Sequence, residues 1–196
     1  MISILILAAG NASRMRGADK LAEPVDGVPL LHLQCQRALS TGYQVFVALP
    51  SSDHPRLDLI RDLPVTPLFV PDAAEGISGT LRGAVKMLPK GDVLVFLGDL
   101  AEVEAEDLYT ICNARVAHPN AKIWRAATAE GKPGHPVLFH QSTRPMFEDI
   151  TGDNGGEAIV KSLKQQTVLV PLFGNRARRD LDTPEDWAAF RAKTGR

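Results

Sequence analysis

A loop of small and basic residues follows the first apolar run of the chain. It extends from Leu7 to Lys20 and reads LAAGNASRMRGADK. Small residues allow backbone N–H groups to approach phosphate oxygens, and Arg14 and Lys20 supply the positive charge that a triphosphate needs. Because the dinucleotide fingerprint GxGxxG and the Walker A pattern GxxxxGK(S/T) are absent, the loop predicts another kind of phosphate site. The alternative for this segment alone is a surface turn with solvated charges.

Asp99 is the first candidate metal ligand. It follows Gly98 directly after the apolar run at 93–97, which is typical of a buried strand. A carboxylate at the tip of such a strand would lie at the edge of the sheet where ligands bind, and Mg²⁺ prefers oxygen donors. The alternative is structural, because a Gly-Asp pair also begins ordinary turns and caps helices.

A second pair of acids, Asp180 and Asp182, precedes the last predicted helix. In an extended chain alternate side chains point to the same side, so either carboxylate could join Asp99 around a metal ion. Acids at this position could instead only cap the helix. That interpretation suits Glu185 and Asp186 better than it suits Asp182.

These residues need a scaffold, and the apolar periodicity predicts one in which strands and helices alternate. We expect strands at 2–9, 44–49, 66–70 and 92–97, and helices at 29–40, 54–63, 79–88 and 104–117. In the second half we expect strands at 121–128 and 135–140 joined by a tight turn at 131–134, helices at 143–150 and 156–164, a strand at 168–173 and a helix from Pro184. Ser78 and Thr183 are the predicted N-caps of their helices.

The alternation predicts one α/β domain over residues 1–196, built as a three-layer, doubly wound, Rossmann-like sheet. The first strand is expected near the centre of the sheet, because it is apolar on both sides. The turn at 131–134 predicts an antiparallel element in the C-terminal half of an otherwise mostly parallel sheet. In such sheets ligands bind outside the carboxyl ends of the strands, where the loop at 7–20 and Asp99 would lie.

The composition excludes several classes of function. Lys and Arg together number 22 against 23 Asp and Glu, so a nucleic acid, which needs a basic excess, is not an expected partner. No apolar run approaches the roughly 20 residues needed to span a bilayer, and the first one lacks the flanks of a signal peptide. Cys35 and Cys112 are expected to be buried thiols in a reducing compartment. We therefore expect a cytoplasmic protein without a membrane partner.

Several of these segments together resemble the nucleotidyltransferases of molybdenum cofactor maturation, which are MobA-like NTP transferases. The similar segments are the loop LAAGNASRMRGADK, the strand end at 98–99 and the run DLDTPED at 180–186. Shorter similar segments follow in the same order at 75–82, 134–138 and 152–156. The LAAG start is similar to the cytidylyltransferases of this group, whereas their guanylyl-transferring relatives usually read LAGG. The resemblance spans nearly the whole chain.

The resemblance implies roles for individual residues. Nucleotide binding is implied for Leu7, Ala8, Ala9, Gly10, Lys20, Ser78, Gly79 and Gly98. Arg14 and Lys20 would hold the triphosphate. The implied catalytic residues are these two together with Asp99 and Asp182. Asp99 and Asp182 would hold Mg²⁺. The acceptor would face His135, Pro136, Gly152 and Asp153. For His135, fixing a loop by hydrogen bonds is the alternative.

Two departures from the family's pattern bear on the acceptor. Relatives commonly have Gly-Asp-x-Pro where this chain has GDLA at 98–101, and Gly-Asp-Arg-Gly where it has GDNG at 152–155. The metal carboxylate is kept. The missing arginine removes a charge that could have met an anionic acceptor.

The implied reaction transfers CMP from CTP to a phosphorylated acceptor and releases pyrophosphate. The expected acceptor is of the molybdopterin type, and a molybdoenzyme or its chaperone is the expected protein partner. Three other functions stay open: the same transfer to a sugar phosphate or other small phosphorylated acceptor, nucleotide binding without turnover in an accessory protein, and a dinucleotide-dependent oxidation. The absent GxGxxG fingerprint argues against the oxidation.

Overall fold

The chain folds around a mixed sheet. The structure, a computed structural model, describes the whole chain apart from the side chain of Asp153. In this described part the sheet has seven strands in the order β5-β4-β1-β6-β8-β7-β9. They are β1 (Ile2–Leu7), β4 (Gln44–Leu49), β5 (Thr66–Phe69), β6 (Asp92–Leu97), β7 (Ile123–Ala127), β8 (Pro133–Phe139) and β9 (Thr167–Pro171).

Strand directions confirm the predicted mostly parallel sheet with an antiparallel element. β1 lies inside the sheet, parallel to both β4 and β6, and β4 is parallel to β5. β8 runs antiparallel to both β6 and β7, whereas β9 is again parallel to β7. Because β8 is reversed, its first residues lie at the edge of the sheet where β1 and β6 end. That edge carries the candidate site.

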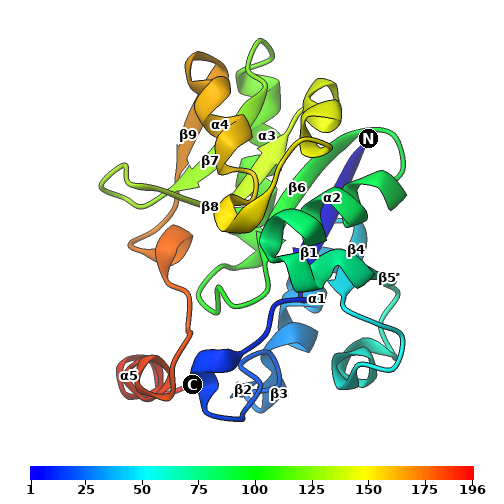
Figure 1. Ribbon diagram of the computed structural model, residues 1–196. Helices are drawn as coiled ribbons and strands as arrows, with labels where there is room; N and C mark the ends of the chain where they lie inside the picture. The colour runs from blue at the N-terminus through cyan, green and yellow to red at the C-terminus, as the bar shows by residue number, and fades with distance from the viewer.

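Helices cover both faces of the sheet and complete the predicted three layers (Figure 1). The α-helices are α1 (Leu30–Leu39), α2 (Ile77–Met87), α3 (Ala105–Ala117), α4 (Glu157–Ser162) and α5 (Pro184–Thr194). One hydrophobic core joins the sheet to α1, α3 and α5, and the other joins it to α2 and α4. Alternation within β6 supplies both cores, since Leu94 and Phe96 face one and Val93 and Val95 face the other.

Two segments predicted as α-helices are 3₁₀-helices. At 54–63 the structure has Pro55–Ile60, where Pro64 disfavours further helical residues before it. At 143–150 it has Gln141–Phe147, in which Pro145 lacks the N–H that an α-helix would use. Five further short 3₁₀-turns connect the described elements, at Ser13–Met15, Pro71–Glu75, Gly152–Asn154, Lys164–Gln166 and Arg176–Arg178.

A short hairpin that the sequence analysis does not predict precedes α1. It pairs β2 (Pro24–Val25) with β3 (Val28–Pro29). Its turn residues Asp26 and Gly27 have φ values of 54° and 79°, and an Asp-Gly pair is a common choice when both turn residues are left-handed. The Asp-Gly pair was therefore an available signal for this hairpin.

Both cysteines are buried in helices that face the same core. Cys35 lies in α1 and Cys112 in α3, and both thiols are free. Burial raises the pKa of each thiol to about 12, which makes them unreactive core residues as predicted. Within the described part of the chain, no helix has the length and apolar character required to cross a bilayer.

Candidate active site

A buried arginine braces the loop that follows β1. Nη1 of Arg56 donates to the carbonyl oxygens of Ala8 and Gly10 at 2.6 and 2.8 Å. Its Nε and Nη2 donate to the two carboxylate oxygens of Asp19 at 2.7 and 2.8 Å. Burial alone would raise the pKa of Asp19, but the hydrogen bonds and charge of Arg56 outweigh it and lower that pKa. Arg56 therefore ties the beginning of the loop to its end.

Lys20 joins two carboxylates that are far apart in the sequence. Its Nζ lies 2.5 Å from Oδ2 of Asp99 and 2.6 Å from Oδ1 of Asp182. All three side chains are mostly buried, with exposed fractions of 17, 16 and 14%. Burial would lower the pKa of Lys20, but the two carboxylates outweigh burial and raise it. The ammonium therefore stays charged between them.

Asp182, rather than Asp180, shares Lys20 with Asp99. The amide of Leu181 donates to the carbonyl oxygen of Asp99 at 3.4 Å, which holds this segment against the end of β6. Arg14 adds an ion pair of 2.8 Å to Oδ2 of Asp182. Asp180 is exposed and lines a neighbouring cavity. Burial, with the nearby charges of the two other acids, raises the pKa of Asp180.

The helix that follows is capped as predicted. Thr183 is the N-cap of α5, and its hydroxyl accepts from the amide of Asp186 at 3.1 Å. The Asp186 carboxylate accepts in return from the amides of Asp182 and Thr183. Capping is therefore done by Thr183 and Asp186, and the carboxylate of Asp182 is left to bind Lys20 and Arg14.

The paired carboxylates fit a hard divalent cation. Oδ1 of Asp99 is buried without a hydrogen-bond partner among the described residues, so one acceptor of this pair is unused. The Lys20 ammonium already takes a cation's place between the two acids. The described residues contain no cluster of three or more His, Cys, Asp or Glu that could hold a metal on its own. Two carboxylates complemented by substrate phosphates and water are a common donor set for Mg²⁺.

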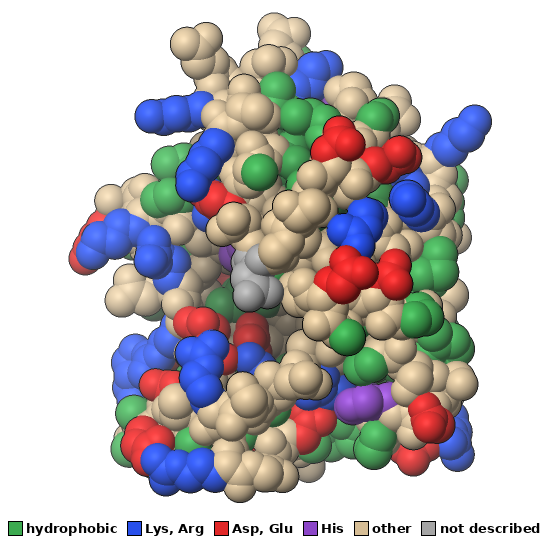
Figure 2. Space-filling model, in the orientation of Figure 1, with side chains coloured by type: hydrophobic (Ala, Val, Ile, Leu, Met, Phe, Trp, Pro, Cys, Tyr) green, Lys and Arg blue, Asp and Glu red, His purple; other side chains and the backbone are tan. Residues whose placement is uncertain are grey.

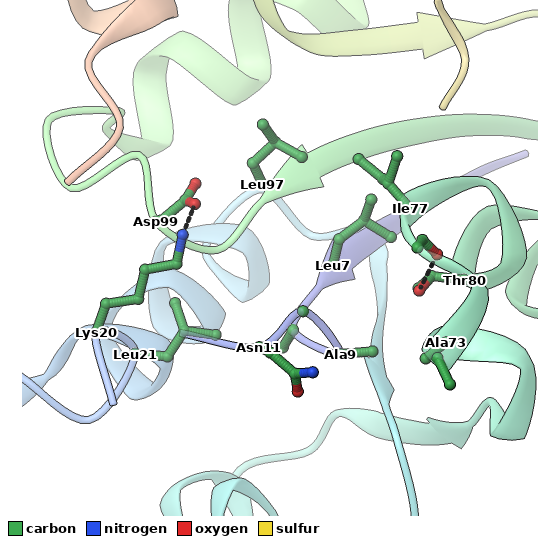
Figure 3. A pocket seen from close by; sticks show the side chains of 14 residues that line it. Leu7, Ala9, Asn11, Lys20, Leu21, Ala73, Ile77, Thr80, Leu97 and Asp99 are labelled. Carbon is green, nitrogen blue, oxygen red and sulfur yellow. Dashed lines mark hydrogen bonds and ion pairs between the residues drawn. The ribbon is translucent and has the colours of Figure 1, made fainter. Parts of the chain in front are cut away.

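A cavity of about 290 Å³ opens beside this cluster, between the end of β1 and the start of α2. Figure 3 shows Lys20 reaching Asp99 at one side of it, with Ile77 and Thr80 at the other. The predicted residues that line it are Leu7, Ala8, Ala9, Gly10, Lys20 and Asp99. Sequence reasoning missed most of the opposite wall, which consists of Ala73, Ala74, Gly76, Ile77 and Thr80. Acidic and basic side chains gather around the hollow on this face of the molecule (Figure 2).

Three residues predicted to bind the nucleotide do not line this cavity. Ser78 is buried and is not an N-cap, because α2 begins at Ile77; its hydroxyl accepts from the amide of Gly155 at 3.1 Å. A Cβ at Gly79 would lie only 2.1 Å from the carbonyl oxygen of Asp72, so this glycine allows close packing. Gly98 is buried against β1 and donates to the carbonyl oxygen of Leu7 at 3.3 Å. All three residues therefore lie behind the residues that line the cavity and pack against other parts of the chain.

The predicted acceptor residues are placed less uniformly. His135 lines two further cavities beside the end of β6, whereas Pro136 is buried in β8 and lines neither of them. Gly152 is exposed and also lies outside these cavities. The side chain of Asp153 lies outside the described residues. Asn154, where relatives commonly carry arginine, lines the more apolar of the two cavities.

A basic loop and paired carboxylates beside a cavity at the carboxyl ends of parallel strands are features that a nucleotidyltransferase requires. Comparison with known proteins gives the family. The profile described as MobA-like NTP transferase domain matches residues 4–168, so the chain belongs to the MobA-like NTP transferase family.

Three known proteins are similar to this chain over nearly its whole length. The purine catabolism protein PucB of Bacillus subtilis (strain 168) is 27% identical over 201 residues, covering 95% of this chain and 94% of PucB. The manganese complex of Rv0371c from Mycobacterium tuberculosis H37Rv superposes with a TM-score of 0.77 at 22% identity, covering 96% of each chain. Molybdopterin-guanine dinucleotide biosynthesis protein A of Archaeoglobus fulgidus has a TM-score of 0.69 at 13% identity, covering 98% of each. At these identities the two structural likenesses establish the fold.

Proposed function

We propose that this protein transfers CMP from CTP to the phosphate of a molybdopterin-type acceptor, releases pyrophosphate and uses Mg²⁺. The observation that carries the proposal is the Lys20–Asp99–Asp182 cluster at the rim of the cavity after β1. The choice of CTP rests on the LAAG start of the loop, in which Ala9 lines the cavity. The choice of acceptor rests on the resemblance to molybdenum cofactor maturation enzymes.

The reaction requires no covalent intermediate on the protein. An acceptor phosphate oxygen attacks the α-phosphorus, and the bond from the α-phosphorus to the bridging oxygen breaks. The electron pair of that bond leaves with pyrophosphate. An ionised phosphate is already a competent nucleophile, so the protein contributes position and charge.

The chain's own residues divide this work. Lys20 and Arg14 neutralise charge on the phosphates, and Arg56 holds the loop in shape. Asp99 and Asp182 would hold Mg²⁺, which when bound supplies further neutralisation of phosphate charge. Lys20 must then leave the carboxylates, so we expect its ammonium to move from Asp99 and Asp182 to the triphosphate.

The proposal extends to the setting of the reaction. Two free, buried thiols support a reducing, cytoplasmic compartment. A molybdoenzyme or its chaperone would receive the finished cofactor, and the whole chain would act as one domain.

A nucleotide panel tests the reaction. The purified protein is incubated with Mg²⁺, molybdopterin-type cofactor and CTP, GTP, ATP or UTP in turn, and pyrophosphate release is measured with the mass of any product. Preferential formation of a cytosine dinucleotide supports the proposal. Turnover only with sugar phosphates or other phosphorylated acceptors would replace the proposed acceptor. CTP binding without any product would indicate an accessory protein instead.

A further inference from the structure

A second cavity, of about 190 Å³, lies next to the nucleotide cavity and has a different character. Ile77 lines both, so the two are neighbours at the start of α2. Most of its wall is apolar, formed by Ile77, Leu81, Val95, Val137, Phe139 and Val160. A sugar ring would leave most of its hydroxyls unpaired against such a wall, whereas a flat ring could bury its faces there.

The charged side chains that line this cavity, among those that the structure describes, form a single pair. Nη1 of Arg125 lies 2.9 Å from Oε2 of Glu157, and Nε of Arg125 donates to the carbonyl oxygen of Gly134 at 3.0 Å. Arg125 comes from β7 and Glu157 from the first turn of α4. Only Oε2 of Glu157 has a polar partner among the described residues. The carboxylate can therefore accept further hydrogen bonds, and Arg125 fixes its position.

His135 adds a neutral polar group. Its Nδ1 is buried and has no hydrogen-bond partner among the described residues. Burial and, to a smaller extent, the Arg125 charge lower the pKa of His135 to about 4, although the Glu157 charge opposes them. At neutral pH the imidazole is uncharged, and the charges of Arg125 and Glu157 cancel. The cavity thus suits the uncharged end of an acceptor, while the acceptor's phosphate would lie near Lys20.

We propose that Glu157, positioned by Arg125, selects the acceptor by accepting hydrogen bonds from the N–H edge of a flat nitrogen heterocycle lodged in this cavity. A carboxylate pairs well with adjacent ring N–H and amino groups, because each of its oxygens accepts one of them. Asn154 and His135 supply weaker contacts along the same wall. This inference rests on the proposed function, since it identifies the cavity as part of the acceptor site.

Two commercial heterocycles test the inference without any phosphate transfer. Pterin carries an amino group beside its ring N–H, and lumazine carries an oxo group in place of that amino group. We expect the wild-type protein to bind pterin at least about tenfold more tightly than lumazine in equilibrium dialysis, because lumazine replaces one charge-assisted donor to the carboxylate with an oxo oxygen that the carboxylate repels. Equal affinities, or no binding of pterin by the wild type, would overturn the inference.

A variant assigns the preference to Glu157. We expect Glu157→Gln to lose the preference for pterin. The matched control is Glu106→Gln, an exposed glutamate in the first turn of α3, which should keep it. A preference that survives in a folded Glu157→Gln protein, judged by its circular dichroism, contradicts the assignment. Binding of CTP with Mg²⁺ is measured on the same proteins, so failure of the nucleotide site would be seen separately.

Discussion

The Lys20 ammonium lies 2.5 Å from the Asp99 carboxylate, although 79 positions separate the two residues in the chain. The same ammonium is the group that would meet a triphosphate in the proposed reaction. Substrate and carboxylates therefore compete for Lys20, and Lys20 and a divalent cation compete for the carboxylates. These competitions predict opposite effects of one substitution on two ligands.

Lys20→Met should strengthen the binding of Mn²⁺ alone and weaken the binding of CTP. Without the ammonium, Asp99 loses its positive partner and Asp182 keeps only Arg14, so a divalent cation gains affinity, on the order of tenfold or more. The phosphates lose a positive partner, so nucleotide affinity falls by a similar factor. Electron paramagnetic resonance of free Mn²⁺ measures the first effect and calorimetry of CTP the second. If both affinities fall together, Lys20 and the cation do not share a site.

Asp99→Asn should greatly slow transfer while leaving the fold intact. The amide keeps the shape of the side chain but removes the charge that holds Lys20 and would hold the metal. We expect turnover to fall by about 10²- to 10³-fold or more, as is usual when an electrostatic group at a reacting phosphate or oxyanion is lost. Pyrophosphate release gives the rate, and circular dichroism checks folding. Asp62→Asn, at a side chain that is 76% exposed, is the control and should stay active.

Arg56→Met should destabilise the protein and loosen the nucleotide loop. The change leaves two loop carbonyls and the Asp19 carboxylate without their buried partner. We expect the free energy of unfolding to fall by about 2–4 kcal/mol, measured by urea titration, together with a raised KM for CTP. Arg61→Met removes only an exposed ion pair with Asp58 and should change stability by less than about 0.5 kcal/mol. Equal effects of the two variants would argue against the bracing role.

His135→Gln should make stability less sensitive to mild acid. The pKa of His135 is about 4 in the folded chain and about 6.5 when unfolded, so the unfolded state binds more protons between these values. Stability contributed by the neutral imidazole is therefore present above pH 6.5 and is lost as the pH falls toward 4. Between about pH 7 and pH 5 the wild type should lose roughly 2 kcal/mol more than the variant. Urea titrations at both pH values give the difference, and parallel losses in both proteins would contradict it.

Strand-end reasoning predicts the edge of the sheet at which the loop after β1 and Asp99 lie, because the geometry of parallel sheets constrains that edge. Leu7 ends β1, and Asp99 lies just beyond the end of the neighbouring parallel strand β6, so a sequence pattern suffices to bring the loop and this carboxylate to one edge. The order of the strands in the sheet was harder to predict from the sequence. The turn at 131–134 predicts that β7 and β8 pair, but it does not predict that β8 inserts between β6 and β7.

Other residues of the site lack any local signal. Arg56 acts on partners 37 to 48 positions earlier in the chain, and no periodicity marks it. Glu157 has the appearance of an ordinary first-turn helix acid, and only the tertiary structure places it beside Arg125. The segment around Ser78 illustrates the reverse case, because the motif is recognisable but the Ser78 side chain packs away from the cavity, which Ile77 and Thr80 line instead.

The reversal of β8 brings two cavities of different character to one edge of the sheet. The nucleotide cavity is built from residues up to Asp99, whereas the polar groups of the neighbouring cavity all come from residues after 120. The two cavities meet at Ile77. Because this side chain is apolar, the cavities share no charged residue among those that line them. On the proposed assignment, substitutions within residues 125–160 would therefore redirect the nucleotide to a new recipient while Lys20, Asp99 and Asp182 stay in place.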